Sequence, residues 1–156
     1  MDELQATAKR VARKNIDDHL KSIKLNSDAL GSMIRQWFRS LSQQEAATYE
    51  PRWKIYQAKI NSETGRLAEP SALKLPSKAT ELLFRHYNQQ KKLDAKLKAS
   101  SNQLRNAYIK KLSTEIEALN EQGLRSQAAI LTQEIESVGK DSLGLLDHFG
   151  MNPIQP

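Results

Sequence analysis

Apolar residues recur every three or four positions over most of the chain, which is the spacing of one face of an α-helix. Residues 3–24 have this spacing, and residues 30–41 have it again with the bulkiest apolar cluster of the chain. Between them, Asn26-Ser27-Asp28 is typical of a helix end followed by a new N-cap, because short polar side chains accept hydrogen bonds from free helix amides. The pattern therefore predicts two helices before Ser42.

The region after Ser42 predicts a further break and restart. Ser42 and Glu45 have the spacing of a capping box, so the chain is expected either to break here or to continue as helix to about Tyr49. Pro51 suits the first turn of a new helix, where its missing amide hydrogen costs nothing. Residues 61–76 then contain prolines and a glycine that interrupt the period, which indicates a linker.

The longest regular pattern extends from Lys78 to about Asn120, a stretch with neither glycine nor proline. Its leucines, isoleucines and tyrosines step by three and four throughout, which predicts one long helix. Such a stripe must be buried against something, because propensity alone stabilises isolated helices poorly. Gln90 and Ser101 are polar positions within the stripe, and they either fix the register of a helix pairing or mark a solvated segment.

The C-terminal part of the pattern predicts a helical hairpin and a tail. Gly123 suits a left-handed C-terminal cap of the long helix, and the apolar positions in residues 124–138 predict a short helix that folds back. Residues 140–156 retain several large apolar side chains, which is unusual for a disordered tail. The tail is therefore expected either to dock on the helices or to bind a partner as a linear motif.

Together these elements predict an all-α fold, an elongated, coiled-coil-like helical bundle with one long central helix and a C-terminal helical hairpin. Its parts are the N-terminal helices of residues 1–60, the linker 61–76, the long helix with its hairpin in 77–139, and the tail 140–156. With 156 residues, the chain is expected to form one structural unit overall.

The composition limits the possible cellular locations of the protein and the kinds of chemical site that it can form. The chain has no cysteine, which excludes disulfides and thiolate metal sites. No apolar run is long enough to span a membrane, and acids stand near the N-terminus where a signal peptide needs cations. A soluble, cytoplasmic protein is expected, unless the chain is an excised fragment of a longer one.

The net charge of +6 is distributed unevenly along the chain. Residues 1–60 carry 11 basic and 7 acidic groups, residues 61–111 carry 11 and 4, and residues 112–156 carry 2 and 7. Either the acidic C-terminal hairpin folds back on the chain's own basic helix, or the basic middle segment faces an acidic partner.

The segment from Tyr108 to Ile135 resembles a helical-hairpin pattern found in large exported proteins of some environmental bacteria. One position departs from that pattern, because Leu124 stands where an acidic residue usually follows the glycine. The resemblance implies a structural or linker role and a cell-envelope location, and it implies no catalytic chemistry. The matching residues are Tyr108, Leu112, Leu119, Gly123, Ala128, Glu134 and Ile135.

Catalytic, cofactor and metal motifs are absent from the sequence. His19, His86 and His148 each lack acidic residues at the helical spacing of a metal site, and His86 is expected to be a partly exposed helix residue. There is no glycine-rich phosphate loop and no Gly-x-Ser-x-Gly elbow. The sequence therefore predicts no catalytic residue, no cofactor and no metal, and an enzyme is the least favoured function class.

Two groups of residues are candidates for binding. Aromatic residues with nearby arginines match the composition of protein interfaces, although packing in the core is the ordinary role of tryptophan. Clustered cations on the long helix suit phosphate groups, although charge runs are usually solvated helix faces. The candidate partner-binding residues are Trp37, Phe38, Arg39 and Trp53, and the candidate phosphate-binding residues are Lys91, Lys92, Lys96, Lys98, Arg105, Lys110 and Lys111.

The sequence thus predicts a non-enzymatic interaction or scaffold module that acts through protein–protein contacts. A protein partner or self-association is expected, because a single chain of this composition covers its long apolar stripe only in part. The alternative is a nucleic-acid-binding accessory protein that uses the basic face of residues 85–111.

Overall fold

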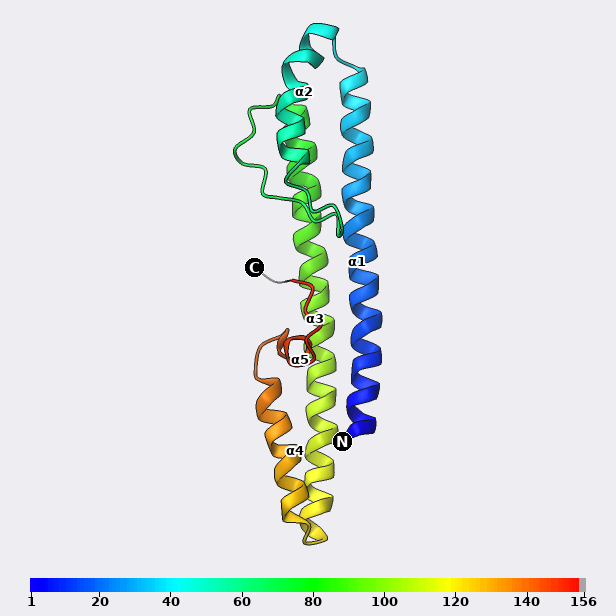
Figure 1. Ribbon diagram of the computed structural model, residues 1–156, viewed down its shortest axis with the longest axis vertical. Coiled ribbons are helices and arrows are strands. Elements are labelled where there is room, and N and C mark those ends of the chain that lie inside the picture. Colours follow the sequence, from blue (N-terminus) through cyan, green and yellow to red (C-terminus); the bar gives the residue numbers. More distant parts are fainter. Residues whose placement is uncertain (155–156) are drawn as a thin grey trace. The chain divides into compact units, whose positions relative to one another are not determined.

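The computed structural model describes residues 1–154, and the last two residues of the expected tail, Gln155 and Pro156, lie outside the described part. Over the described residues the chain is helical and has no strand, as the apolar spacing predicts (Figure 1). The helices are α1 (Asp2–Arg39), α2 (Gln43–Gln57), α3 (Ser77–Glu121), α4 (Arg125–Val138) and α5 (Gly144–His148).

Helix α1 is continuous where the sequence predicted two helices. The expected break at Asn26 is wrong because this side chain does not cap a helix. Its Nδ2 donates a 2.9 Å hydrogen bond to the carbonyl oxygen of His86 in α3. A contact with the neighbouring helix therefore satisfies the buried amide, and the backbone remains helical through Ser27 and Asp28.

Helix α2 begins at the expected capping box and continues past Pro51. The Glu45 amide donates a 3.2 Å hydrogen bond to Ser42 Oγ, and Ser42 stands at the N-cap. The prediction that Pro51 starts a new helix is wrong, because this residue lies inside α2. Trp53 and Tyr56 on the following turn are buried, so packing offsets the hydrogen bond that proline cannot make.

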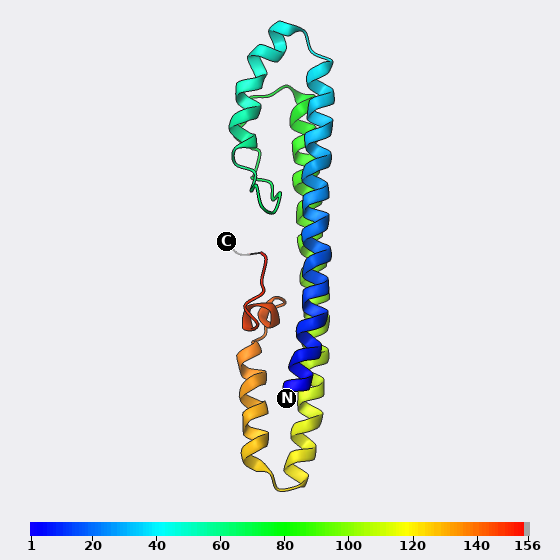
Figure 2. The same cartoon turned by 45° about the vertical axis from the view of Figure 1, so that its right-hand side comes forward.

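The chain divides into two compact units, and their boundary falls within both long helices. Unit 1 comprises Met1–Asp18 and Ala95–Pro156, and unit 2 comprises His19–Asp94. In each unit, a segment of α1 lies antiparallel to a segment of α3 (Figures 1 and 2).

The two units follow the same plan (Figure 2). In unit 2, α1 ends and α2 folds back, while in unit 1, α3 ends and α4 folds back. The sequence offset from the end of α1 to the end of α3 equals the offset from the start of α2 to the start of α4. At this offset Leu30 corresponds to Leu112, and both are fully buried. A long helix with a short returning helix is thus the building element of both units.

Each unit has its own apolar core, and Leu145 and Phe149 of the tail pack in the core of unit 1. Leu145 and Leu146 of α5 are both fully buried. The core of unit 2 consists of Leu30, Ile34, Trp37, Trp53, Tyr56, Leu67, Ala79 and Leu83. The core of unit 1 consists of Ala8, Tyr108, Leu112, Leu131, Val138 and Leu145.

Candidate functional site

A partly buried carboxylate, Asp94 of α3, lies at the centre of one polar cluster in unit 2. His19 Nε2 of α1 lies 2.9 Å from Asp94 Oδ1, and the Arg66 guanidinium reaches both carboxylate oxygens from the loop before α3. The His19 residue is only 6% exposed, and its Nδ1 has no hydrogen-bond partner within the described part of the chain. The cluster fastens α1, the loop before α3 and α3 together through the two oxygens of Asp94.

Unit 1 has a comparable centre at Glu134 of α4. Its Oε1 accepts hydrogen bonds from Gln5 Nε2 at 2.9 Å and from the Tyr108 hydroxyl at 2.7 Å. His148 Nε2 lies 2.9 Å from the same oxygen. These contacts join α1, α3, α4 and α5 at one buried oxygen.

The contacts of Glu134 set its charge state. Burial raises the pKa of this carboxyl, but the hydrogen bonds from Gln5, Tyr108 and His148 and the charge of His148 outweigh burial and lower the pKa below its ordinary value. For Tyr108, burial and the bond to Glu134 both raise the pKa of the phenol. Glu134 is therefore an ionised carboxylate that holds unit 1 together.

These contacts bring two histidines next to acids, which the sequence did not predict. Asp94 is 75 positions from His19, and the donor Gln5 is 129 positions from Glu134. The prediction for His86 is wrong, because this residue is 7% exposed and its Nδ1 lies 2.8 Å from the Leu82 carbonyl oxygen. Within residues 1–154, no group of three or more histidines and acids is arranged to hold a metal ion.

The candidate partner-binding residues divide into core and surface. Trp37 and Trp53 are 6% and 9% exposed and belong to the core of unit 2. Phe38 is partly buried against that core, with its ring centroid 5.0 Å from that of Trp37. Arg39 is exposed. Core packing thus accounts for most of the tryptophan surface, but one edge of Trp37 lines a pocket.

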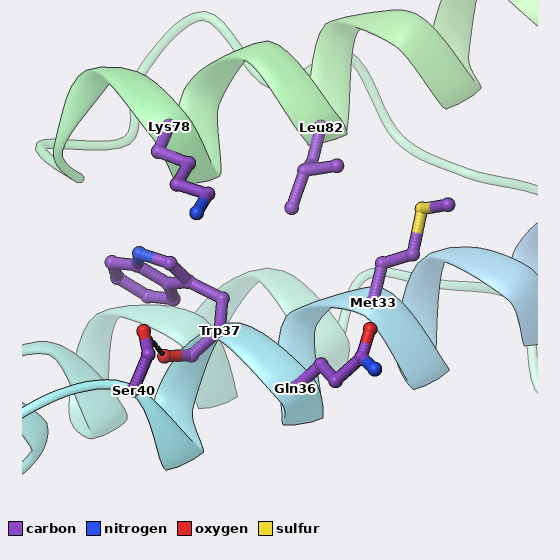
Figure 3. Close-up of a pocket in the computed structure, with 6 residues that line it drawn as sticks. All are labelled: Met33, Gln36, Trp37, Ser40, Lys78 and Leu82. Carbon is purple, nitrogen blue, oxygen red and sulfur yellow. Dashed lines mark hydrogen bonds between the residues drawn. The ribbon is translucent and has the colours of Figure 1, made fainter.

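This pocket, called the Trp37 groove below, lies between α1 and α3 in unit 2 and has a volume of about 290 Å³ (Figure 3). Met33 and Leu82 face each other across it, and the Lys78 side chain points toward the indole of Trp37. Met33 is 40% exposed although it is apolar. The groove therefore offers apolar surface with one cation beside it. Its lining is Met33, Gln36, Trp37, Ser40, Lys78 and Leu82.

The candidate phosphate-binding lysines are exposed, but Arg105 is used internally. Its Nε donates a 2.8 Å hydrogen bond to the Gly139 carbonyl oxygen, and Nη1 donates to Asn106. Lys91 Nζ lies 4.8 Å from the centroid of the Tyr87 ring. Among residues 1–154, no ion pair involves Lys91, Lys92, Lys96, Lys98, Lys110 or Lys111.

All of the net positive charge of the chain lies in unit 2. This unit contains 13 of the lysines and arginines and 7 of the acids, which gives +6, whereas unit 1 contains 11 of each. The unit that bears the Trp37 groove is therefore also the unit with the net positive charge.

Within the described residues, no helix combines the length and apolar character that a membrane span requires. No protein-family model, no curated protein and no solved structure matches the chain.

Proposed function

We propose that the chain is a non-enzymatic helical interaction module that binds a helical segment of an acidic protein partner in the Trp37 groove. The observation that carries the proposal is an apolar groove between two helices, with a cation beside it, in the unit that has all of the net positive charge. An amphipathic helix placed in a groove between two helices is a common mode of recognition.

The outer surface of α1 supports a helical partner. Leu25, Ala29, Met33 and Gln36 are spaced by four, four and three residues and share one side of the helix. Leu25 is 68% exposed and Met33 is 40% exposed, which is unusual for side chains of this size on one stripe. A third helix laid along this stripe would complete the coiled-coil-like bundle that the apolar spacing predicts.

The charge around the groove defines the partner. Lys78 lines it, and the exposed Arg39 lies about one turn beyond Gln36, another lining residue, on α1. Neither cation takes part in an ion pair within residues 1–154. An apolar anchor flanked by aspartate or glutamate would bury its side chain between Met33 and Leu82 and place its carboxylate near Lys78.

Site-specific photocrosslinking in the source cells tests this function. Met33 is replaced by a photoreactive phenylalanine, and Ile55 of α2 serves as the matched control, because it is also an exposed apolar residue of unit 2. We expect a discrete protein adduct from position 33 and none from position 55. Equal adducts at both positions, or none at position 33, would contradict the proposal.

A second copy of the chain is the other possible occupant of this groove. Light scattering across a concentration series distinguishes it, since self-association raises the average mass with concentration. If the adduct at position 33 has the mass of two chains, the acidic partner is replaced by self-association.

Nucleic acid is the second candidate ligand, and the exposed, unpaired lysines of α3 favour it. Phosphate contacts release counterions, so binding would weaken steeply as salt rises. A gel-shift titration with duplex DNA and with single-stranded RNA at several salt concentrations tests this alternative. Absence of salt-sensitive binding would exclude it.

A further inference from the structure

A second pocket of unit 2 lies between α1, the end of α2 and the residues that follow α2, and its volume is about 360 Å³. This volume falls within the range of small-molecule sites. Its lining differs from that of the Trp37 groove, because it includes one acid, one arginine and several serines beside an apolar wall. The residues used below are Asp28, Gly31, Ser32, Arg35, Trp53 and Ile60.

The two charged residues of this pocket are not paired with each other. Asp28 and Arg35 are seven positions apart on α1 and therefore lie on the same side of the helix. No ion pair joins them, and within the described residues neither pairs with another charge. Arg35 Nη2 donates only a 3.1 Å hydrogen bond to Ser32 Oγ.

The Arg35 guanidinium is directed along α1 toward Asp28. A Cβ atom built on Gly31 would lie 3.5 Å from Arg35 Nη1, so the cation sits over Gly31. Gly31 is one helical turn from Asp28. Asp28 and Arg35 are both exposed on this side of α1, so a small molecule with an anionic and a cationic group close together can reach both from solvent.

Gly31 is a glycine inside α1 that lines this pocket. Glycine inside a helix costs about 1 kcal/mol relative to alanine. Packing does not require it, because the only atom near an added Cβ is Arg35 Nη1, at an ordinary contact distance of 3.5 Å. The missing side chain keeps the floor of the pocket open at a cost in stability.

We propose that this pocket binds a free amino acid with an apolar side chain. The carboxylate of the amino acid would meet Arg35 and the Ser32 hydroxyl, and its ammonium group would meet Asp28. Its side chain would pack on Trp53 and Ile60, which form the apolar wall. This proposal is independent of the partner helix in the Trp37 groove.

Calorimetric titration of the full chain with matched ligands tests the pocket. L-phenylalanine is compared with 3-phenylpropionate, which lacks the ammonium group, and with phenethylamine, which lacks the carboxylate. L-leucine is compared in the same way with 4-methylpentanoate and isoamylamine. We expect saturable binding of at least one amino acid, with each of its analogues at least tenfold weaker. Absence of saturable binding by both amino acids, or equal affinity of an amino acid and its analogues, would overturn the proposal.

Three variants assign the contacts. Asp28→Asn should remove the preference for the amino acid over its deaminated analogue, and Arg35→Gln should remove the preference over the decarboxylated one. Gly31→Ala should raise the thermal midpoint and weaken amino-acid binding at least tenfold. The exposed Lys59→Gln, which does not line the pocket, is the control and should change neither quantity. Full affinity in the stabilised Gly31→Ala variant would place the ligand elsewhere and overturn the assignment.

Discussion

The Tyr108 hydroxyl donates a 2.7 Å hydrogen bond to Glu134 Oε1 and so joins α3 to α4 in the interior of unit 1. Gln5 donates to the same oxygen, and His148 lies within hydrogen-bond distance of it. One carboxylate oxygen thus connects the N-terminal segment, the long helix and the tail. Its removal leaves the buried Tyr108 hydroxyl and the half-buried Gln5 and His148 without this partner, which is costlier than the loss of a single bond.

We therefore expect Glu134→Ala to lower the free energy of unfolding by about 2–3 kcal/mol, because the buried Tyr108 hydroxyl and two half-buried groups lose their charged acceptor. Urea unfolding followed by circular dichroism measures the change. Glu136→Ala is the matched control, since Glu136 is an exposed acid of the same helix and should shift stability by less than about 0.5 kcal/mol. Equal losses in the two variants would show that the contacts of Glu134 have no special weight.

Tyr56 makes the stability of the protein depend on pH in the alkaline range. Burial, together with the charges of Tyr87 and Glu69, raises its pKa from 10.0 to about 12. Between these values the unfolded chain has lost the phenolic proton and the folded chain still holds it. Stability therefore falls as pH rises from 10 to 12.

The Tyr56→Phe variant should reduce this alkaline slope. At neutral pH it should cost about 1 kcal/mol, because Tyr56 donates a 2.7 Å hydrogen bond to the Ala68 carbonyl oxygen. Some slope remains from Tyr108, whose pKa is also raised. Urea unfolding at several pH values between 9 and 12 provides the comparison, and identical slopes in both proteins would refute the assignment.

The parts of the fold that depend on neighbours in sequence were predictable. The apolar spacing predicts α3 almost to its ends, and Gly123, at a φ of 77°, ends the long helix as expected. Asn26 shows the limit of this reasoning, because an asparagine that resembles a helix end is satisfied by a backbone carbonyl of another helix. Only the packing of α1 on α3 decides between the two roles.

The polar centres were not predictable, because each joins residues distant in sequence. His19 has no acid at helical spacing that would suggest a partner, and Asp94 reaches it from another helix. The same holds for Glu134, which belongs to the predicted hairpin but receives its donors from α1, α3 and α5. The Trp37 groove was predictable in part, since the aromatic cluster drew attention to Trp37 but not to Lys78 or Leu82.

The capping box of α2 allows a direct test of a local prediction. Ser42→Ala removes the acceptor for the Glu45 amide and should lower the free energy of unfolding by about 1 kcal/mol. Ser137→Ala is the control, because the Ser137 hydroxyl donates its hydrogen bond to the Gln133 carbonyl oxygen within the same helix. This control should be neutral or slightly stabilising, and a similar loss in both variants would contradict the role of the cap.

Charge reversal at Lys78 tests whether the Trp37 groove selects an acidic helix. The probes are two designed helical peptides with the same leucine stripe, one flanked by glutamates and one by lysines. Because exposed ion pairs are screened by salt, binding of the acidic peptide should weaken as ionic strength rises. In fluorescence anisotropy, Lys78→Glu should weaken the acidic peptide at least fivefold and strengthen the basic one, while the exposed Lys91→Glu should alter both only slightly. If Lys91→Glu acts as strongly as Lys78→Glu, attraction to the net charge of unit 2 explains the binding, and the groove does not select its partner.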